Sequence, residues 1–339
     1  MRKLSALLIA ISITITLLSV YYKYYANMPL SANSEKINFT IEPGMSFSGV
    51  TQQLKKFGLI SNELPWNVFG RLNGATDVLK AGEYSITQNV SPRQLLGKLI
   101  QGDTIQYSLT VIEGWTFNQL WDAIKGHEKI TQTVNTTDEL LEKLDFNNRN
   151  PEGWFYPDTY NFSTGTTDVE FFQRAFKHMI KILDEEWPKR QADIPLKSPT
   201  EALILASIIE KETSVEDERT MVAAVFVTRL KRGMRLQTDP TVIYGLGESY
   251  DGNIRRKDLK SDTPYNTYLH KGLPPTPIAL PSRASIAAAL APADVDVVYF
   301  VSKGDGTHYF SSTYEEHRKA VIKYQLKGNE NLYKADKNH

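Results

Sequence analysis

The pattern of apolar and polar residues divides the chain into an apolar N-terminal stretch and a long series of short amphipathic elements. From Leu4 to Tyr22 the sequence carries no charged residue and consists mostly of Leu, Ile and Ala. A helix needs roughly 20 such residues to cross the hydrocarbon core of a membrane. Tyrosines gather at the end of this stretch and just after it, as they do at membrane interfaces. We therefore predict a transmembrane helix over 4–22.

The charges that flank the apolar stretch indicate its orientation. Arg2 and Lys3 precede it together with the N-terminal amine, and cytoplasmic flanks carry the excess of positive residues. We expect residues 1–3 in the cytoplasm, a polar linker over 23–36, and the rest of the chain on the other side of the membrane. A cleaved signal peptide is the alternative, but it requires a shorter apolar core and a small-x-small cleavage site.

A strand-and-helix pattern occurs twice after the linker. Phe39–Leu54 and Leu109–Ile124 both contain an apolar-Thr-apolar run, a glycine, a Ser or Thr followed by Phe, and apolar residues spaced three to four apart. This order predicts a strand, a glycine turn, a hydroxyl N-cap and an amphipathic helix. Between the two copies, Ser91-Pro92 predicts the start of another helix. These units resemble LysM modules, which bind polymers containing N-acetylglucosamine, and a plain α+β spacer has the same pattern.

The whole chain is accordingly predicted to be α+β. We expect a small LysM-like α/β module over 37–107, a connecting α/β region over 108–195, and a larger α+β domain over 196–335. Within the connecting region, the aromatic-dense segment Glu152–Phe162 predicts a loop that packs in a core or stacks on sugars. A long amphipathic helix is predicted over 167–187.

Helix signals are densest in Ser198–Gly247. Ser198-Pro199 opens a helix that is apolar on nearly every face until Glu210, which predicts a buried helix. A second Ser-x-x-Asp signature, at Ser214, predicts the start of the next helix. Beyond this helix the pattern predicts, in order, a polar turn around Pro240, a Pro- and Tyr-rich loop over 264–281 and a β-hairpin over 295–313.

The composition of the chain excludes several classes of functional site. The chain has 39 Lys and Arg against 39 Asp and Glu, so it lacks the positive excess of a nucleic-acid-binding protein. It contains no cysteine, which excludes disulfides, thiol nucleophiles and thiolate metal sites. The H-E-x-x-H, Walker A and G-x-S-x-G motifs are also absent from the sequence. Carboxylate chemistry without a metal or a cofactor remains.

Two carboxylates close the predicted buried helix. At about 100° per residue, Glu212 falls in line with Leu205, Ile208 and Ile209, whereas Glu210 points to nearly the opposite side. The larger apolar side chains on the Glu212 face make it the better candidate for desolvation. Desolvation raises the pKa of a carboxyl group and keeps it protonated, as a general acid must be. The alternative is that both are ordinary surface carboxylates in the last helical turn.

A series of ordered motifs runs through the same part of the chain: ASIIEKET, then ER at Glu218-Arg219, VFVTRL, GMRLQTDPTVIYG, PYNTY, GLPPTPIALP and YFVSKGDGTHYF. These motifs resemble those of the endolytic murein (peptidoglycan) transglycosylases, the MltG/YceG-like family, and the likeness extends over nearly the whole chain. The resemblance implies a bacterial inner-membrane enzyme whose bulk lies in the periplasm. Such an enzyme is a lyase: it cleaves the β-1,4 bond between N-acetylmuramic acid and N-acetylglucosamine within nascent glycan strands. The product is a 1,6-anhydromuramic acid end, which terminates strand elongation.

The resemblance also implies that the catalytic residue is the second Glu of the EKET motif, Glu212. We choose the supporting residues separately, from the polar and aromatic side chains of the neighbouring motifs. The candidates for hydrogen bonds to sugar hydroxyl and acetamido groups are Gln237, Asp239, Asn266 and Tyr268; those for stacking on sugar rings are Tyr244 and Tyr265. Arg219 is expected to pair with Glu218 or with a peptide-stem carboxylate. Each of these residues has a structural role as its alternative.

Two other functions fit the same residues. One is an inverting muramidase, a hydrolase with Glu212 as acid and Asp239 or Glu218 as base. The other is a non-catalytic, membrane-tethered peptidoglycan-binding protein. Expected partners are glycan strands, the membrane, and possible contacts with penicillin-binding synthases and the elongation or division machinery, with no nucleic acid.

Overall fold

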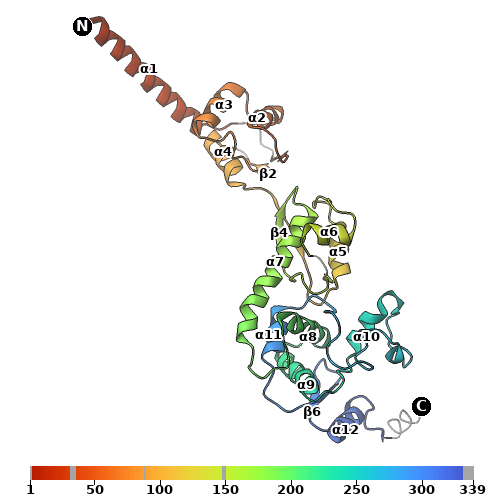
Figure 1. Ribbon diagram of the computed structural model, residues 1–339. Helices are drawn as coiled ribbons and strands as arrows, with labels where there is room; N and C mark the ends of the chain where they lie inside the picture. Colours follow the sequence, from red (N-terminus) through yellow and green to blue (C-terminus); the bar gives the residue numbers. More distant parts are fainter. Residues whose placement is uncertain (1, 31–35, 88, 147–149, 331–339) are drawn as a thin grey trace. The chain divides into compact units, whose positions relative to one another are not determined.

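The computed structural model describes residues 2–30, 36–87, 89–146 and 150–330 (Figure 1). Two compact units make up the chain. The first comprises 1–108 with the short segments 128–131 and 161–167, and the second comprises 109–127, 132–160 and 168–339. Both contain helices and strands, as predicted. Most of the predicted connecting region lies in the second unit with the larger domain, whereas its residues 108, 128–131 and 161–167 belong to the first unit. Residues 331–335 of the larger domain lie outside the described residues.

The N-terminal helix α1 (Arg2–Asn27) is long and apolar enough to cross a membrane. Over Lys3–Asn27 its mean hydropathy reaches 2.2. The helix continues past the predicted span to Asn27, and the side chains of Tyr25 and Ala26 are buried in the core of the first unit. The predicted linker therefore begins as folded structure. Its residues 31–35 lie outside the described residues.

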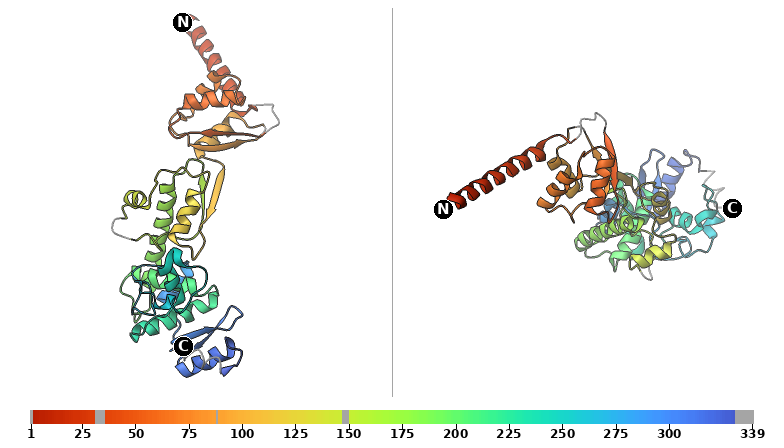
Figure 2. Two further views of the ribbon diagram at one scale, coloured as in Figure 1. Left: turned by 90° about the vertical axis from the view of Figure 1, so that its right-hand side faces the viewer. Right: turned by 90° about the horizontal axis from the view of Figure 1, so that it is seen from above.

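The first unit is built on an antiparallel strand pair. Strands β1 (Ile37–Ile41) and β2 (Gly82–Ile86) pair in the register Ile37 opposite Ile86. Three helices lie to one side of them (Figure 2): α2 (Phe47–Lys56), α3 (Glu63–Leu72) and α4 (Pro92–Gln101). The core between the layers holds the fully buried rings of Trp66 and Tyr84. Helix α3 was not predicted from the sequence, although Glu63, Asn67 and Arg71 form a polar face at a spacing of four residues.

The two copies of the sequence repeat fold as predicted. In the first copy β1 leads into α2, whose N-cap Ser46 accepts a hydrogen bond from the Gly49 N–H. In the second copy β3 (Gln106–Thr110) leads into α5 (Phe117–Lys125), which Thr116 caps in the same way. The turn of each copy contains a glycine with positive φ, Gly44 at 80° and Gly114 at 78°. A side chain at either turn would be strained.

The rest of the connecting region carries α6 (Thr137–Lys143), β4 (Thr159–Ser163), α7 (Asp168–Glu186) and the short η1 (Trp187–Lys189). Strands β3 and β4 form a two-stranded sheet. The aromatic segment 152–162 contributes to the core: Phe155 is fully buried and its ring lies 5.3 Å from that of Phe172, centroid to centroid. Of the two uses predicted for these aromatic rings, packing is the one observed.

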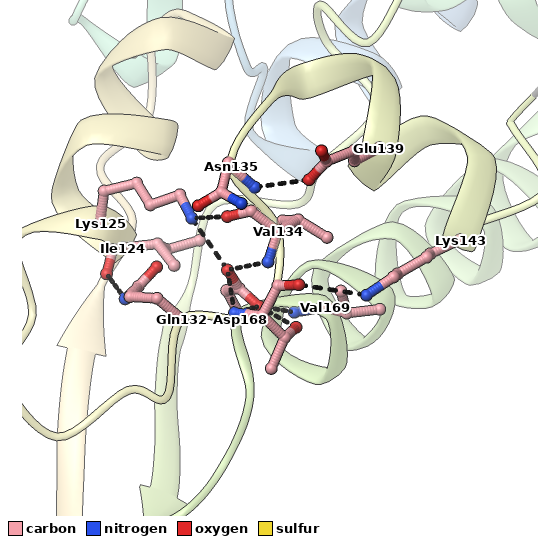
Figure 3. A network of polar contacts seen from close by, with 10 residues as sticks. Ile124, Lys125, Gln132, Val134, Asn135, Glu139, Lys143, Asp168 and Val169 are labelled. Atoms are coloured by element: carbon pink, nitrogen blue, oxygen red, sulfur yellow. Dashed lines mark hydrogen bonds and ion pairs between the residues drawn. The ribbon is translucent and has the colours of Figure 1, made fainter.

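A buried carboxylate organises the start of α7 (Figure 3). Asp168 has no exposed surface and accepts hydrogen bonds from the Thr133 hydroxyl at 2.6 Å and from Lys125 Nζ at 3.0 Å. Burial by itself would raise the pKa of Asp168, but these donors outweigh it and hold the pKa below its ordinary value. The network joins the end of α5 to the start of α7.

The remaining elements surround the predicted buried helix, α8 (Pro199–Glu212), whose N-cap Ser198 accepts from the Glu201 N–H at 3.2 Å. They are the turn η2 (Glu216–Glu218), α9 (Arg219–Lys231), α10 (Asp239–Leu246), the turns η3 (Gly247–Ser249) and η4 (Asp258–Lys260), α11 (Arg283–Leu290), the hairpin strands β5 (Tyr299–Ser302) and β6 (His308–Ser311), and α12 (Tyr314–Tyr324).

The hairpin and the loop over 264–281 agree with the prediction, and two other predictions need correction. Ser214 does not start the next helix, because a 3-10 turn comes first and α9 begins only at Arg219. The predicted turn around Pro240 is the first turn of α10, where the missing N–H of a proline costs nothing.

Candidate active site

Glu212 is the last residue of α8 and lies in a cavity of about 530 Å³ in the second unit. The walls come from α9, from the hairpin strands β5 and β6, and from α12. Aromatic and aliphatic side chains such as Tyr299, Phe300 and Val301 form one side of it. A volume of this size is typical of small-molecule or oligomer subsites.

The carboxyl group of Glu212 is suited to hold a proton near neutral pH. Its pKa is raised from an ordinary value of 4.5 to about 7, mainly because the group is buried, and the neighbouring charge of Asp239 acts in the same direction. A hydrogen bond from the Thr238 hydroxyl to Oε1, and the nearby His308 and Arg229, act in the opposite direction. The direction of the shift is the one predicted from the helical face. The cavity walls that enclose the carboxyl group come from other elements, and not from Leu205 or Ile208.

Glu210 has a different environment. Its side chain is only 6% exposed, and Oε2 accepts hydrogen bonds from the N–H of Ser282 at 2.9 Å and from its hydroxyl at 2.5 Å. Arg219 lies 4.0 Å from Oε1. Because Ser282 is the N-cap of α11, Glu210 connects the end of α8 to the start of α11. Its carboxylate is therefore occupied by structural partners.

Three of the predicted supporting residues share the cavity with Glu212. They are Gln237, Asp239 and Tyr268. The Tyr268 hydroxyl donates a hydrogen bond of 2.6 Å to Oδ1 of Asp239, which orients both groups. Gln237 adopts a positive φ of 51°, and its N–H donates to the carbonyl of Thr267 at 3.2 Å. Strained backbone of this kind is common at ligand sites.

Other predicted residues have structural partners elsewhere. Tyr244 donates to the buried Glu152 at 3.1 Å, and the Tyr265 hydroxyl lies 2.8 Å from that of Thr276. Asn266 is fully buried and donates to the backbone carbonyls of Leu259 and Ser261, at 3.1 and 2.7 Å.

Of the two partners predicted for Arg219, Glu218 is corrected, because Arg219 lies beside Glu210. Pairing of Arg219 with a peptide-stem carboxylate stays a prediction. The carboxylate of Glu218 instead binds His308. Its Oε2 lies 2.7 Å from Nδ1 of the His308 ring, and its Oε1 accepts the His308 backbone N–H at 2.8 Å. Both side chains are nearly buried, at 14% and 13% exposure. Sequence reasoning missed His308, which lines the Glu212 cavity, although it stands in the GDGTHYF motif.

Arg229 is a second cavity residue that the sequence did not indicate. Its guanidinium donates to the carbonyls of Val298 at 2.7 Å and Leu236 at 2.6 Å, and it lies 5.4 Å from the ring centroid of Tyr299. These contacts fix a positive charge beside the cavity. In the sequence, a basic residue at this position indicates only the end of a helix, because Arg229 lies in the last turn of α9.

Comparison with known proteins shows the family of this chain. The model of the YceG-like family matches residues 39–323. The chain belongs to the YceG-like family. It is 34% identical over 315 residues to the endolytic murein transglycosylase of Bacillus subtilis (strain 168), covering 87% of this chain and 86% of that protein.

Two further members of the comparison extend the likeness. The endolytic murein transglycosylase of Streptococcus pneumoniae serotype 2 (strain D39) is 28% identical over 343 residues, covering 89% of this chain, which spans 61% of that protein's length. The crystal structure of a yceG-like protein from Listeria monocytogenes shares 33% of its sequence with this chain, with a TM-score of 0.54. That match covers 85% of this chain and 99% of the other.

Proposed function

We propose that this protein is a membrane-anchored endolytic murein transglycosylase with Glu212 as its catalytic residue. The observation that carries the proposal is a carboxyl group with a pKa of about 7, enclosed in a cavity, in a YceG-like chain whose relative at 34% identity has this activity by name. Its substrate is peptidoglycan, cut within the glycan strand.

The reaction needs one proton-handling group. Protonated Glu212 donates its proton to the glycosidic oxygen, and the bond from C1 of the N-acetylmuramic acid to that oxygen breaks. The 6-hydroxyl of the same sugar then attacks C1, and its proton returns to the Glu212 carboxylate. The product is a 1,6-anhydro sugar, and no water is consumed. Since the nucleophile belongs to the substrate, its proximity replaces a bound water.

Polar groups around Glu212 support the transition state. Positive charge develops at C1 as the glycosidic bond breaks. Asp239, whose negative charge raises the pKa of Glu212, would also stabilise this positive charge. Gln237 and His308 offer hydrogen bonds to hydroxyl or acetamido groups of the bound sugars.

The alternative hydrolase would need a second free carboxylate to activate water. The two candidates, Asp239 and Glu218, both have protein partners: Asp239 accepts from Tyr268, and Glu218 accepts from His308. These partners favour the single-carboxylate lyase over the inverting muramidase.

The N-terminal part supplies attachment in this proposal. Helix α1 anchors the chain in the bacterial inner membrane with its N-terminus in the cytoplasm, so that the rest lies in the periplasm beside the wall. The order β1–α2–α3–β2 with an antiparallel strand pair supports a LysM-like module that holds glycan. Wall synthases such as penicillin-binding proteins remain proposed partners.

Digestion of purified sacculi followed by mass spectrometry of the muropeptides tests the proposal. We expect 1,6-anhydromuramic products from the wild-type chain and none from Glu212→Gln, which keeps the shape of the side chain. Glu210→Gln is the matched control two residues away: it should lower the melting temperature yet leave the same products. Reducing ends in place of anhydro ends would identify a hydrolase. Sugar binding without any turnover would identify a non-catalytic binding protein.

A further inference from the structure

Helix α3 exposes a row of large apolar side chains. Leu64, Val68 and Leu72 are 69%, 49% and 68% exposed. A spacing of four residues places them on one face of the helix. The adjoining face packs Trp66 and Phe69 into the core of the first unit. We name Leu64, Val68 and Leu72 the α3 stripe.

The stripe is fixed to the end of the membrane-spanning helix. The ring of Phe69 on α3 lies 5.5 Å from the ring of Tyr22 and 5.9 Å from that of Tyr25, between centroids. Asn73, the C-cap of α3, also donates a hydrogen bond of 3.1 Å from its Nδ2 to the Tyr22 hydroxyl. Helix α3 therefore lies on the side of the first unit from which α1 projects (Figure 1).

The position at which α1 leaves the membrane determines the depth of the α3 stripe relative to the membrane interface. The uncharged stretch ends at Tyr22, and a helix rises 1.5 Å per residue, so Tyr22 and Tyr25 lie within about 5 Å of each other along the axis. Leu72 is adjacent to the residue that Tyr22 binds. At least the C-terminal end of α3 is thus level with the membrane interface.

We propose that the α3 stripe is a lipid contact, and that α3 lies in the interfacial region of the membrane next to the anchor. This inference rests on the proposed membrane anchoring by α1. Tyr21 and Tyr24, 55% and 68% exposed, extend the same interfacial surface along α1, and Lys23 and Arg71 supply positive charges beside it.

This contact would hold the first unit against the bilayer in one orientation. A single spanning helix would leave that unit able to rotate about the helix axis and to tilt with the helix. With α3 in the interface, the anchor and the helix provide two contacts with the membrane, and two contacts restrict tilt. A second copy of the chain is the competing occupant of the stripe, but the continuity with the tyrosines of the span favours lipid.

The absence of cysteine allows a direct test on the full chain. Single variants Leu64→Cys, Val68→Cys and Leu72→Cys are labelled with an environment-sensitive fluorophore and reconstituted in phosphatidylcholine–phosphatidylglycerol vesicles containing spin-labelled lipid. Ile112→Cys and Val295→Cys, 52% and 42% exposed in the second unit, are the matched controls. Ile13→Cys reports the span. We expect the lipid to quench the stripe probes several-fold more than the two controls.

Three results would overturn the inference in distinguishable ways. In the first, the Ile13 probe is strongly quenched but the stripe probes are quenched no more than the controls. This result would support the anchor and contradict the lipid contact. No quenching at Ile13 removes the proposed anchoring, and the inference with it. Energy transfer between stripe probes on different copies at low protein-to-lipid ratio, without lipid quenching, assigns the stripe to a dimer. A chain with Leu64→Gln, Val68→Gln and Leu72→Gln together should bind the membrane surface less, provided that it keeps its melting temperature. We expect the first unit to rotate faster in this variant, as measured by fluorescence anisotropy.

Discussion

The carboxylate of Glu218 holds His308 at two points, the ring Nδ1 at 2.7 Å and the backbone N–H at 2.8 Å. This contact fixes the orientation of the ring in the cavity that contains Glu212. A carboxylate on Nδ1 also keeps the proton there, so that Nε2 is the remaining ring nitrogen for substrate. Glu218 is therefore a positioning residue that acts through His308.

The first prediction concerns this pair. Glu218→Gln should lower kcat by about 10–100-fold, as removal of an outer partner of a functional imidazole commonly does. The chain should remain folded, because Gln can still accept the backbone N–H. Rates of anhydromuropeptide release and a thermal melt check it. Adding Glu218→Gln to His308→Ala should cause little further loss. Independent, additive losses would show that Glu218 does not act through His308.

A second prediction concerns the pH dependence of turnover. Glu212 must be protonated to donate, and its pKa is raised to about 7, so activity should fall as the pH rises through about 7. Asp239→Asn removes a negative charge that raises this pKa, so the alkaline limb should move to lower pH. Thr238→Val removes a hydrogen bond that lowers the pKa, so the limb should move to higher pH, each by about one unit.

The two variants form a matched pair, because they change adjacent residues and should shift the pH profile of activity in opposite directions. Asn at 239 can still accept the hydrogen bond from Tyr268, which keeps the cavity wall in place. Profiles that move in the same direction would mean that a group other than Glu212 sets the alkaline limb.

A third prediction uses Glu152, which is 4% exposed and binds the Phe117 N–H at 2.9 Å and the Tyr244 hydroxyl at 3.1 Å. Burial raises its pKa from 4.5 to about 7, against the effect of these hydrogen bonds. The folded state thus holds the proton more tightly than the unfolded state, and stability falls as the pH rises from about 4.5 to 7. Glu152→Gln cannot ionise and should escape this loss.

The expected outcome is a variant about as stable as the wild type at pH 4.5 and more stable by up to about 3 kcal/mol above pH 7. Denaturant unfolding at the two pH values measures it. Tyr244→Phe is the control, because it removes one hydrogen bond without removing the charge and should not become more stable at high pH. A constant difference between Glu152→Gln and wild type at all pH values would contradict the raised pKa.

A fourth prediction places the boundary of the anchor. A chain that begins at Ser19 keeps Tyr22, Tyr25 and Ala26, which pack in the core of the first unit. A chain that begins at Met28 loses them and should be less stable by about 3 kcal/mol, as for removal of a buried aromatic side chain. Thermal melts of the two truncated chains in the same buffer compare them. Equal melting temperatures would mean that the end of α1 contributes nothing to that core.

Local signals in the sequence account for much of the fold. The hydroxyl caps Ser46, Thr116 and Ser198 marked helix starts, because a cap depends on residues two or three positions away. The alternation of β5 and β6 around a Gly-Asp-Gly turn marked the hairpin for the same reason. Helix α3 was not predicted from the sequence, and its apolar residues cover both a buried and an exposed part of its surface.

The sequence by itself determined an N-terminal helix apolar and long enough to cross a membrane and the buried helix α8, and it supplied the prediction that Glu212 is the more desolvated of the two carboxylates, since each rests on the residues of one segment. Only the tertiary structure decided the partners of these groups. His308 meets Glu218 across 90 positions, and Tyr244 meets Glu152 across 92, so the hydrogen bonds that hold them depend on how distant elements pack. The raised pKa of Glu212 has the same origin: a helical face indicates which carboxyl can be desolvated, but the strands, helix and charges that enclose it come from elsewhere in the chain.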